Sequence, residues 1–345
     1  MQYKVDKSFV INTLEDLLKT PSPSGYCHNI MKKIEKLVEG LGFKLEYTKK
    51  GAGYINVEGE NKDYTVGIAA HLDTLGGMVR SIKPSGMIRF TSIGGNLMPT
   101  LDGEYCMVHT RKGKEYTGTI LSTSPAAHVY KDAKDKERNE ENLEIRLDEN
   151  VKNKEDVEKL GIKAGDFISI DPKTTLTESG FIKSRHIDDK GGTSCLLSLL
   201  QILNKYKVKP KNNLILFIST YEEVGHGASY IPEEIDELLA VDMGCIGDDL
   251  TCTENDVSIC VKDSSGPYDF GMTNKLIKIA EEEELNHAVD IYPYYGSDAS
   301  AALRAGNNIK CALIGPGVHA SHGMERTHYE GIENTIKLLV SYVLE

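Results

Sequence analysis

The sequence lacks the features that mark secreted and membrane-spanning proteins. Its N-terminus has no apolar core followed by a small-residue cleavage site, so we expect no secretory signal. No uncharged apolar run approaches the length of a membrane span. There is no CxxC pair, and an odd number of scattered cysteines indicates free thiols in a reducing cytoplasm. The cysteines are Cys27, Cys106, Cys195, Cys245, Cys252, Cys260 and Cys311.

The sequence also lacks an excess of positive charge. The chain has 40 Lys and Arg residues against 52 Asp and Glu residues, which gives a formal net charge of -12. Because an acidic chain repels polyanions, we expect neither nucleic acid nor an anionic membrane as a partner. Hydrophobic residues make up 40% of the 345 residues and charged residues 27%, as in ordinary globular proteins. The length suits two domains.

The two ends of the chain have the pattern of an α/β fold. Apolar residues at helical spacing predict helices, and short apolar runs predict buried strands. Their alternation predicts a mostly parallel sheet covered by helices on both faces, in a three-layer α/β/α domain. The predicted helices cover residues 7–19, 28–40, 191–206, 275–284 and 331–344, and the predicted strands cover residues 64–70, 213–220, 238–242 and 309–314.

The middle of the chain has a different pattern. From about residue 78 to residue 179, short alternating runs separated by turn residues predict a β-rich, barrel-like module. It contains one charged stretch, residues 131–144, which we interpret as a solvated loop. The predicted organisation is therefore a discontinuous α/β domain, residues 1–77 and 180–345, interrupted by an inserted β-rich domain, residues 78–179.

Side chains able to bind metal recur at the ends of these predicted elements. Several directly follow an apolar strand, and one opens a helix. In open α/β sheets, the loops at the carboxyl ends of the strands converge on one crevice, so these side chains are able to meet. The candidates are His71, Asp73, Asp188, Glu222, Glu223, Asp242 and His322.

The residue types suit a pair of divalent metal ions. Imidazoles and carboxylates are ligands for Zn²⁺, Co²⁺ and Mn²⁺, and an aspartate is able to bridge two ions through its two oxygens. Asp73 is placed to accept the ring N–H of His71, which would fix the tautomer that binds metal. Adjacent side chains in Glu222-Glu223 diverge, so one can bind metal while Glu222 takes a proton from metal-bound water.

Each of these residues alone also has an ordinary structural interpretation. A His-x-Asp triplet is common by chance, and Glu-Glu pairs are usually solvated. Asp188 is suited to capping the helix that follows it, and Asp242 to a turn. The order of all the candidates along one chain, with three at strand ends, nevertheless favours a metal site.

Longer motifs around these residues resemble the M42 family of metallo-aminopeptidases, the glutamyl or deblocking aminopeptidase group. The matching motifs span nearly the whole chain, and two of them lie in the β-rich module. They are PSGY at 23–26, AHLDTLG at 70–76, VHTRKG at 108–113, LGIKAGD at 160–166, IDDKG at 187–191, STYEEVG at 219–225, AVD at 240–242 and GSDA at 296–299.

The resemblance implies a set of metal ligands. One divalent ion would be held by His71, Asp188 and Asp242. The other would be held by Asp188, Glu223 and His322, so that Asp188 bridges the two ions. The ions would be Zn²⁺ or Co²⁺, with Mn²⁺ as a further candidate, because the sequence does not choose among them.

The resemblance also implies an activity and an assembly. Glu222 would be the general base and Asp73 the residue that orients a ligand. The family acts on free N-termini of peptides, so short peptides would be the substrates. It commonly forms large tetrahedral assemblies built from dimers, which predicts a homo-oligomer, up to a dodecamer. The β-rich module would be its dimerisation domain.

Two departures from the family pattern concern the site. Lys190 stands where Arg is usual, which keeps the charge but loses the planar fork. Residues 321–328 read SHGMERTH in place of the usual Tyr-x-His-Ser, which leaves His322 as the favoured last ligand and His319 as the alternative.

The position of the insertion separates related families. The β-rich module fills the interval between His71 and Asp188, whereas M20-type enzymes carry their extra domain later in the chain and M28 aminopeptidases lack an insertion of this size here. Two alternatives to an aminopeptidase remain: another dimetal amide or acyl hydrolase, such as a deacylase or an M20-like carboxypeptidase, and a scaffold that has lost its chemistry. The preferred N-terminal residue is not readable from the sequence.

Overall fold

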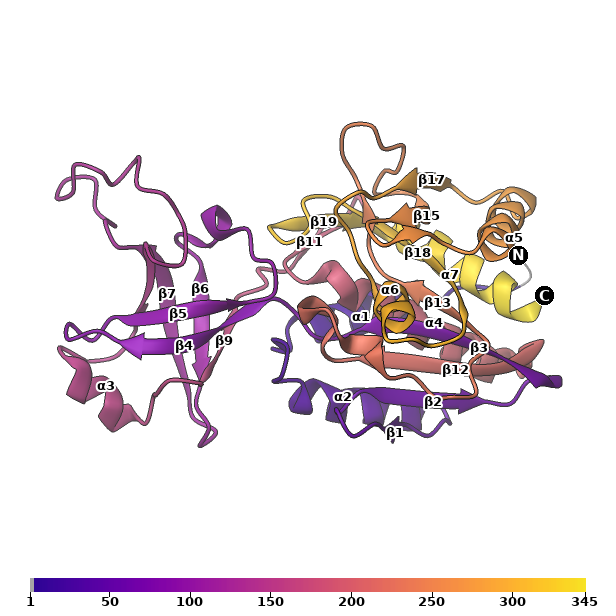
Figure 1. Cartoon of the computed structure of the whole chain (residues 1–345), viewed down its shortest axis with the longest axis horizontal. Helices are drawn as coiled ribbons and strands as arrows, with labels where there is room; N and C mark the ends of the chain where they lie inside the picture. The colour runs from indigo at the N-terminus through magenta and orange to yellow at the C-terminus, as the bar shows by residue number, and fades with distance from the viewer. Residues whose placement is uncertain (1–2) are drawn as a thin grey trace.

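A ten-stranded mixed sheet forms the centre of the larger part of the molecule (Figure 1), in a computed structural model that describes residues 3–345. Its middle strands β12, β3, β13 and β18 are parallel, and antiparallel strands flank them. The spatial order is β1 (Glu46–Tyr47), β2 (Gly53–Val57), β12 (Asn212–Ser219), β3 (Asn61–His71), β13 (Glu237–Val241), β18 (Lys310–Val318), β15 (Val257–Asp263) and β16 (Gly266–Pro267), with β14 (Gly244–Cys245) beside β18 and β17 (His287–Ile291) beside β15.

Alternating side chains of the middle strands fill two separate cores. Ile68 and Leu216 face one core, while their neighbours Ala69 and Phe217 face the other. Because successive side chains of a strand point to opposite faces, a strand that is apolar throughout needs cover on both sides. The first core is covered by α1 (Lys7–Leu18), α2 (His28–Gly40), α4 (Ile187–Tyr206), α5 (Phe270–Glu282) and α7 (Tyr329–Leu344), and the second by α6 (Asp298–Arg304).

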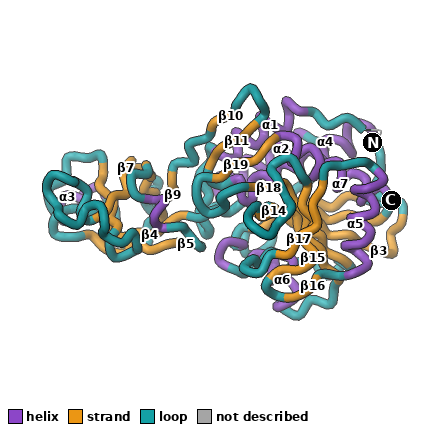
Figure 2. The backbone as a smooth tube through the Cα atoms, turned by 90° about the horizontal axis from the view of Figure 1, so that it is seen from above, coloured by secondary structure: helices purple, strands orange, loops and turns teal. Residues whose placement is uncertain are grey.

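A closed six-stranded antiparallel barrel forms the smaller part of the molecule. Figures 1 and 2 show it to one side of the α/β part. Its strands have the spatial order β4 (Gly76–Ile82), β5 (Ile88–Ile93), β8 (Leu143–Leu147), β7 (Glu115–Ser122), β6 (Tyr105–His109) and β9 (Phe167–Ile170), and it also carries η1 (Met98–Leu101) and α3 (Lys154–Leu160). The predicted fold class, a three-layer α/β/α domain interrupted by a barrel-like insertion, is confirmed.

The barrel joins the α/β part close to the end of β3. The chain enters β4 directly after β3 and returns from β9 through β10 (Thr175–Leu176) and β11 (Phe181–Ser184). β11 pairs with β19 (Glu325–His328), which precedes α7. The barrel strands begin at Gly76 and end at Ile170, whereas the predicted insertion covers 78–179. Both crossings therefore lie near the edge of the sheet where β3 ends.

Most of the predicted elements agree with the structure. Several elements were not predicted, among them α3, α6, β2, β15, β17 and β19. The charged stretch 131–144 is irregular as far as residue 142, and its last two residues begin β8. Within residues 3–345, no helix has both the length and the apolarity required to cross a membrane.

Substitutions in the buried, C-terminal part of β3 should destabilise the fold, whereas substitutions in its exposed first residues should not. Ile68 is fully buried, so Ile68→Ala should reduce the free energy of unfolding by about 2–5 kcal/mol. Asp63 lies on the same strand but is exposed, and Asp63→Ala should change it by less than about 0.5 kcal/mol. Urea unfolding followed by far-UV circular dichroism measures both values. Equal effects of the two substitutions would contradict the assigned core.

Candidate metal centre

The carboxyl ends of the parallel strands bring the candidate residues together. β3 ends at His71, β12 ends just before Glu222 and Glu223, and β13 ends just before Asp242. The connection from β18 to β19 carries His322, and the start of α4 carries Asp188. Contacts within 4.0 Å link these side chains into one cluster.

The carboxylate of Asp188 lies between two imidazoles. Its Oδ1 is 3.0 Å from Nε2 of His71, and its Oδ2 is 3.6 Å from Nε2 of His322. Asp188 is 6% exposed, and its peptide bond to Asp189 is cis. Two oxygens that face two separate imidazoles are the arrangement expected of a carboxylate that bridges two ions.

The ring of His71 is oriented through its other nitrogen. Nδ1 donates to the main-chain oxygen of Asp73 at 2.9 Å, which leaves Nε2 facing the carboxylates. The predicted contact from the Asp73 carboxylate to the ring is longer, 3.7 Å. That carboxylate instead accepts hydrogen bonds from the Ser24 hydroxyl and from the backbone N–H groups of Glu222, at 3.1 Å, and Glu223, at 3.3 Å. Residue 73 thus orients His71 with a backbone atom and the two glutamates with its side chain.

His322 is held in the same manner by the barrel. Its Nδ1 donates to the carbonyl oxygen of Gly95, at 2.9 Å, so Nε2 faces Asp188 and lies 3.7 Å from Oε2 of Glu223. The alternative candidate, His319, pairs through its backbone with Arg326 and is exposed beside Glu254. The structure therefore brings His322, rather than His319, to the cluster.

The remaining carboxylates complete the same cluster. Oε2 of Glu222 lies 3.7 Å from Nε2 of His71, and Oδ1 of Asp242 lies 4.0 Å from the same nitrogen. Ligand atoms of His71, Asp188 and Glu223 all lie within 4.8 Å of one another, as do those of His71, Asp189 and Asp242. Distances of this order allow a metal ion to sit between the groups.

Asp189 is nevertheless occupied by the backbone. One of its oxygens accepts from the N–H of His71 at 3.1 Å, and the other accepts from the N–H of Gly192 at 3.0 Å. A carboxylate with both oxygens bound to backbone N–H groups is suited to capping α4 and fixing the end of β3. We therefore assign Asp189 a structural position next to the cluster.

Negative charge is concentrated in this buried space. Burial and the charge of Asp188 raise the pKa of Asp242 to about 7 and the pKa of Glu223 well above its usual value. Burial, with Asp242 acting in the same direction, also raises the pKa of Glu222. Burial favours neutral His71, but the hydrogen bond to Asp188 and the charges of neighbouring acids raise its pKa. Within residues 3–345 these acids pair with imidazoles and with no Lys or Arg.

Three contributors were missed by sequence reasoning. Glu325 accepts from the backbone N–H groups of Asp188, at 3.1 Å, and His322, at 3.2 Å. Asp298 accepts from Ser219 and Ala228 and so ties α6 to the loop after β12. Gly95 comes from the barrel. Glu325 follows His322 by three residues, and Asp298 lies in the GSDA motif, so both had a signal, whereas Gly95 had none.

Lys190 takes a backbone partner. Its Nζ donates to the carbonyl oxygen of Thr20 at 2.8 Å, and the side chain is fully buried. Burial lowers the pKa of its ammonium group to about 7. Lys190 therefore makes a hydrogen bond between α4 and the connection from α1 to α2.

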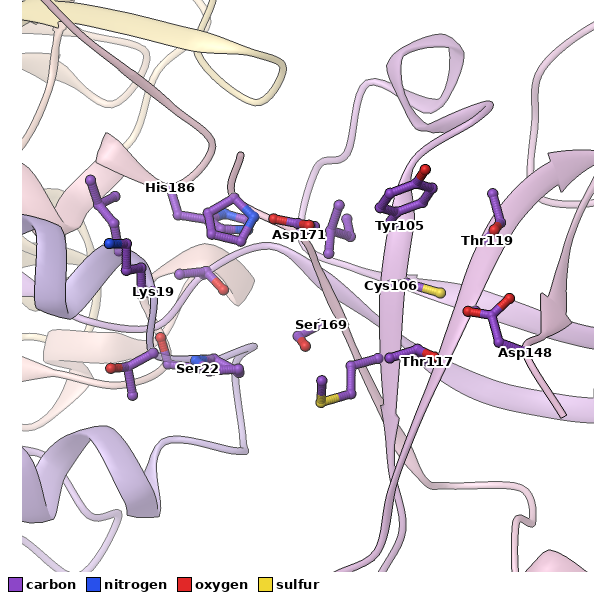
Figure 3. A pocket seen from close by; sticks show the side chains of 18 of the residues that line it. Lys19, Ser22, Tyr105, Cys106, Thr117, Thr119, Asp148, Ser169, Asp171 and His186 are labelled. Atoms are coloured by element: carbon purple, nitrogen blue, oxygen red, sulfur yellow. The ribbon is translucent and has the colours of Figure 1, made fainter. Parts of the chain in front are cut away.

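Two cavities adjoin this region. One, of about 1020 Å³, is lined by Asp188, Glu222, Glu223, Asp242 and His322 and by residues 291–297. The other, of about 620 Å³, lies between the barrel and the α/β part. Figure 3 shows Lys19 and Ser22 on one side of it and Tyr105, Thr117 and Thr119 on the other. No candidate metal ligand lines the second cavity, so the first is the one associated with the cluster.

Imidazoles and carboxylates gathered at the carboxyl edge of a parallel sheet form a site suited to divalent metal, as in metal-dependent enzymes of this architecture. The model of the family described as M42 glutamyl aminopeptidase matches residues 51–338. The chain therefore belongs to the M42 glutamyl aminopeptidase family, as its motifs predict, and it is a peptidase.

Individual proteins are similar to this chain, one in sequence and two in fold. The chain is 45% identical over 331 residues to the YhfE protein of Bacillus subtilis (strain 168), which carries a provisional aminopeptidase name; the match covers 96% of each chain. Among solved structures, the TET aminopeptidase of Thaumarchaeota archaeon SCGC AB-539-E09 is similar, with a TM-score of 0.88, 19% identity and coverage of 98% of this chain and 96% of that one. The TET1 peptidase of Pyrococcus horikoshii, described as assembling into a tetrahedron or a large octahedral shell, has a TM-score of 0.85, 23% identity and coverage of 97% and 99%.

The contact between the barrel and His322 is open to a direct test. A Cβ atom at position 95 would lie 3.1 Å from Nδ1 of His322, so Gly95→Ala should displace the ring and weaken cobalt(II) binding by about tenfold. Gly40→Ala adds the same atom at a position with no neighbour within 4 Å and should leave binding unchanged. Calorimetric titration with cobalt(II) measures both. Unchanged affinity in Gly95→Ala would mean that His322 is not a ligand.

Proposed function

We propose that the chain is an aminopeptidase that removes N-terminal residues from short peptides at a centre of two divalent metal ions. The observation that carries the proposal is the position of the Asp188 carboxylate, 3.0 Å from His71 and 3.6 Å from His322. In this arrangement His71, Asp188 and Asp242 hold one ion. Asp188, Glu223 and His322 hold the other.

The donor set supports metal over an ordinary ion-pair network. Asp188, Glu222, Glu223 and Asp242 are buried together and lack a Lys or Arg partner within the described chain. Buried carboxylates without cationic partners are costly, and divalent cations would offset that cost. A mixed set of nitrogen and oxygen donors favours Zn²⁺, Co²⁺ or Mn²⁺ over Mg²⁺ or Ca²⁺.

Glu222 is the proposed general base. When bound, the metal ions supply the acidity that makes a water molecule nucleophilic near neutral pH. The backbone N–H of Glu222 is bound to Asp73, which fixes its position, and its carboxylate lies within the cluster at 3.7 Å from His71. Because burial raises its pKa, Glu222 is suited to accept a proton from water and pass it to the leaving amine.

The cavity beside the cluster is the proposed substrate site. Its volume of about 1020 Å³ is sufficient for one or two amino-acid residues. Family membership supports a peptide with a free N-terminus as the substrate. Hydrolysis of free peptides but not of N-acylated ones would separate an aminopeptidase from a deacylase or a carboxypeptidase.

We further propose that residues 1–77 and 180–345 form the catalytic domain and that the inserted region, residues 78–179, is a dimerisation domain. The assembly of the Pyrococcus horikoshii relative into a tetrahedron or an octahedral shell supports a homo-oligomer. We propose that it is built from dimers, up to a dodecamer. Seven free cysteines support a reducing, cytoplasmic location.

Removal of metal should lower the melting temperature. Ions that bind the folded chain and not the unfolded chain stabilise it by about 2.7 kcal/mol at a hundred times their Kd, on the order of 5 °C for a chain of this size. Differential scanning fluorimetry of chelated protein, with and without added Zn²⁺ or Co²⁺, measures the shift. Mg²⁺ at the same concentration is the control and should restore little. Identical melting in all samples would contradict the proposed centre.

Glu222→Gln should separate binding from chemistry. The amide keeps the shape but cannot take a proton, so kcat for release of the N-terminal residue should fall by at least about 10²-fold. Metal content should stay that of the wild type. Glu233→Gln changes an exposed glutamate nearby in sequence and should leave kcat unaltered. A fully active Glu222→Gln variant would remove Glu222 as the base.

A further inference from the structure

One hydroxyl group in the site cavity lacks a partner. The Oη atom of Tyr295 is buried and has no hydrogen-bond partner at ordinary distance and angle within residues 3–345. Tyr295 lines the same cavity as Asp242 and Glu222. Buried hydroxyl groups nearly always have a hydrogen-bond partner. The partner of this one is therefore expected among the side chains of the neighbouring metal centre.

The ring that carries this hydroxyl is fixed in place. Ser264 donates to the main-chain oxygen of Tyr295 from its backbone N–H, at 3.1 Å, and from its hydroxyl, at 2.6 Å. The ring packs edge-on against Tyr292, with centroids 5.5 Å apart. The Tyr292 hydroxyl is itself bound to Ser258. The unpaired Oη is therefore held by its surroundings and is not a freely rotating surface group.

Asp242 lines the same cavity and is the carboxylate within hydrogen-bonding reach of this hydroxyl. A tyrosine phenol is protonated near neutral pH and is therefore able to donate to that carboxylate. Oδ1 of Asp242 already accepts from the N–H of Met243 at 2.6 Å. A carboxylate that binds a metal ion retains lone pairs for further donors, and neighbouring donors of this kind fix its orientation.

We propose that Tyr295 is a positioning residue of the metal centre, whose hydroxyl donates to Asp242 and orients that carboxylate toward the ion it shares with His71. This inference rests on the proposed two-metal function and adds a residue from outside its ligand set. Tyr295 touches neither the ions nor the reacting atoms in this role. Its effect is on metal affinity, and through it on activity.

Tyr295→Phe removes only the hydroxyl. Titration with cobalt(II), followed by calorimetry and by the visible absorption of the bound ion, should show about tenfold weaker binding at one of two sites and unchanged binding at the other. The absorption bands of the weakened site should shift. Activity should recover at saturating cobalt(II) with KM unchanged, because the substrate site is intact.

Tyr342→Phe is the matched control. Tyr342 is a buried tyrosine whose hydroxyl donates to the carboxylate of Glu237 at 2.6 Å, at the opposite end of β13 from Asp242. Loss of this phenol–carboxylate bond should lower the melting temperature without changing cobalt(II) affinity. If Tyr295→Phe likewise lowered the melting temperature and left cobalt(II) affinity unchanged, the Tyr295 hydroxyl would have only a structural role.

Two results would overturn the inference. Wild-type cobalt(II) isotherms and spectra in Tyr295→Phe would show that the hydroxyl does not act on Asp242. A raised KM with unchanged metal binding would place the hydroxyl on the substrate instead. Failure of the proposed function would be seen differently, as a lack of peptidase activity in the wild-type protein. In that case the metal titrations would still decide whether Tyr295 acts on Asp242.

Discussion

The Asp188 carboxylate, held between two imidazoles among other buried acids, is the contact on which the rest of the site depends. Its oxygens lie 3.0 Å from His71 and 3.6 Å from His322, so one side chain ties the end of β3 to the connection between β18 and β19. Buried acids repel one another and lose hydration. Backbone hydrogen bonds hold these acids together, and the proposed cations would neutralise their charge.

Backbone donors and the inserted barrel provide much of that support. The carboxylate of Asp73 accepts from the N–H groups of Glu222 and Glu223, and Glu325 accepts from those of Asp188 and His322. The barrel is inserted between β3 and α4, and its Gly95 carbonyl group orients His322. The insertion is thus part of the wall of the site, whatever its part in assembly.

Sequence patterns predicted the fold class and located the candidate residues, because strand ends and helix starts are visible as changes in apolar periodicity. The weakly apolar α6 and the short α3 were missed for the same reason. The sequence could not show which atom of each residue makes a contact. Asp73 was expected to meet His71 through its carboxylate, but a main-chain oxygen makes that contact. Gly95 gave no signal, since a carbonyl group that orients a ligand is independent of residue type.

Anomalous diffraction from crystals grown with Zn²⁺ would show whether two ions share the Asp188 carboxylate. Two strong peaks are expected, one on each side of that carboxylate. One would lie within coordination distance of His71 and Asp242, and the other within coordination distance of Glu223 and His322. A crystal saturated with Zn²⁺ that shows no peak at Asp188, or peaks only elsewhere, would contradict the proposed centre.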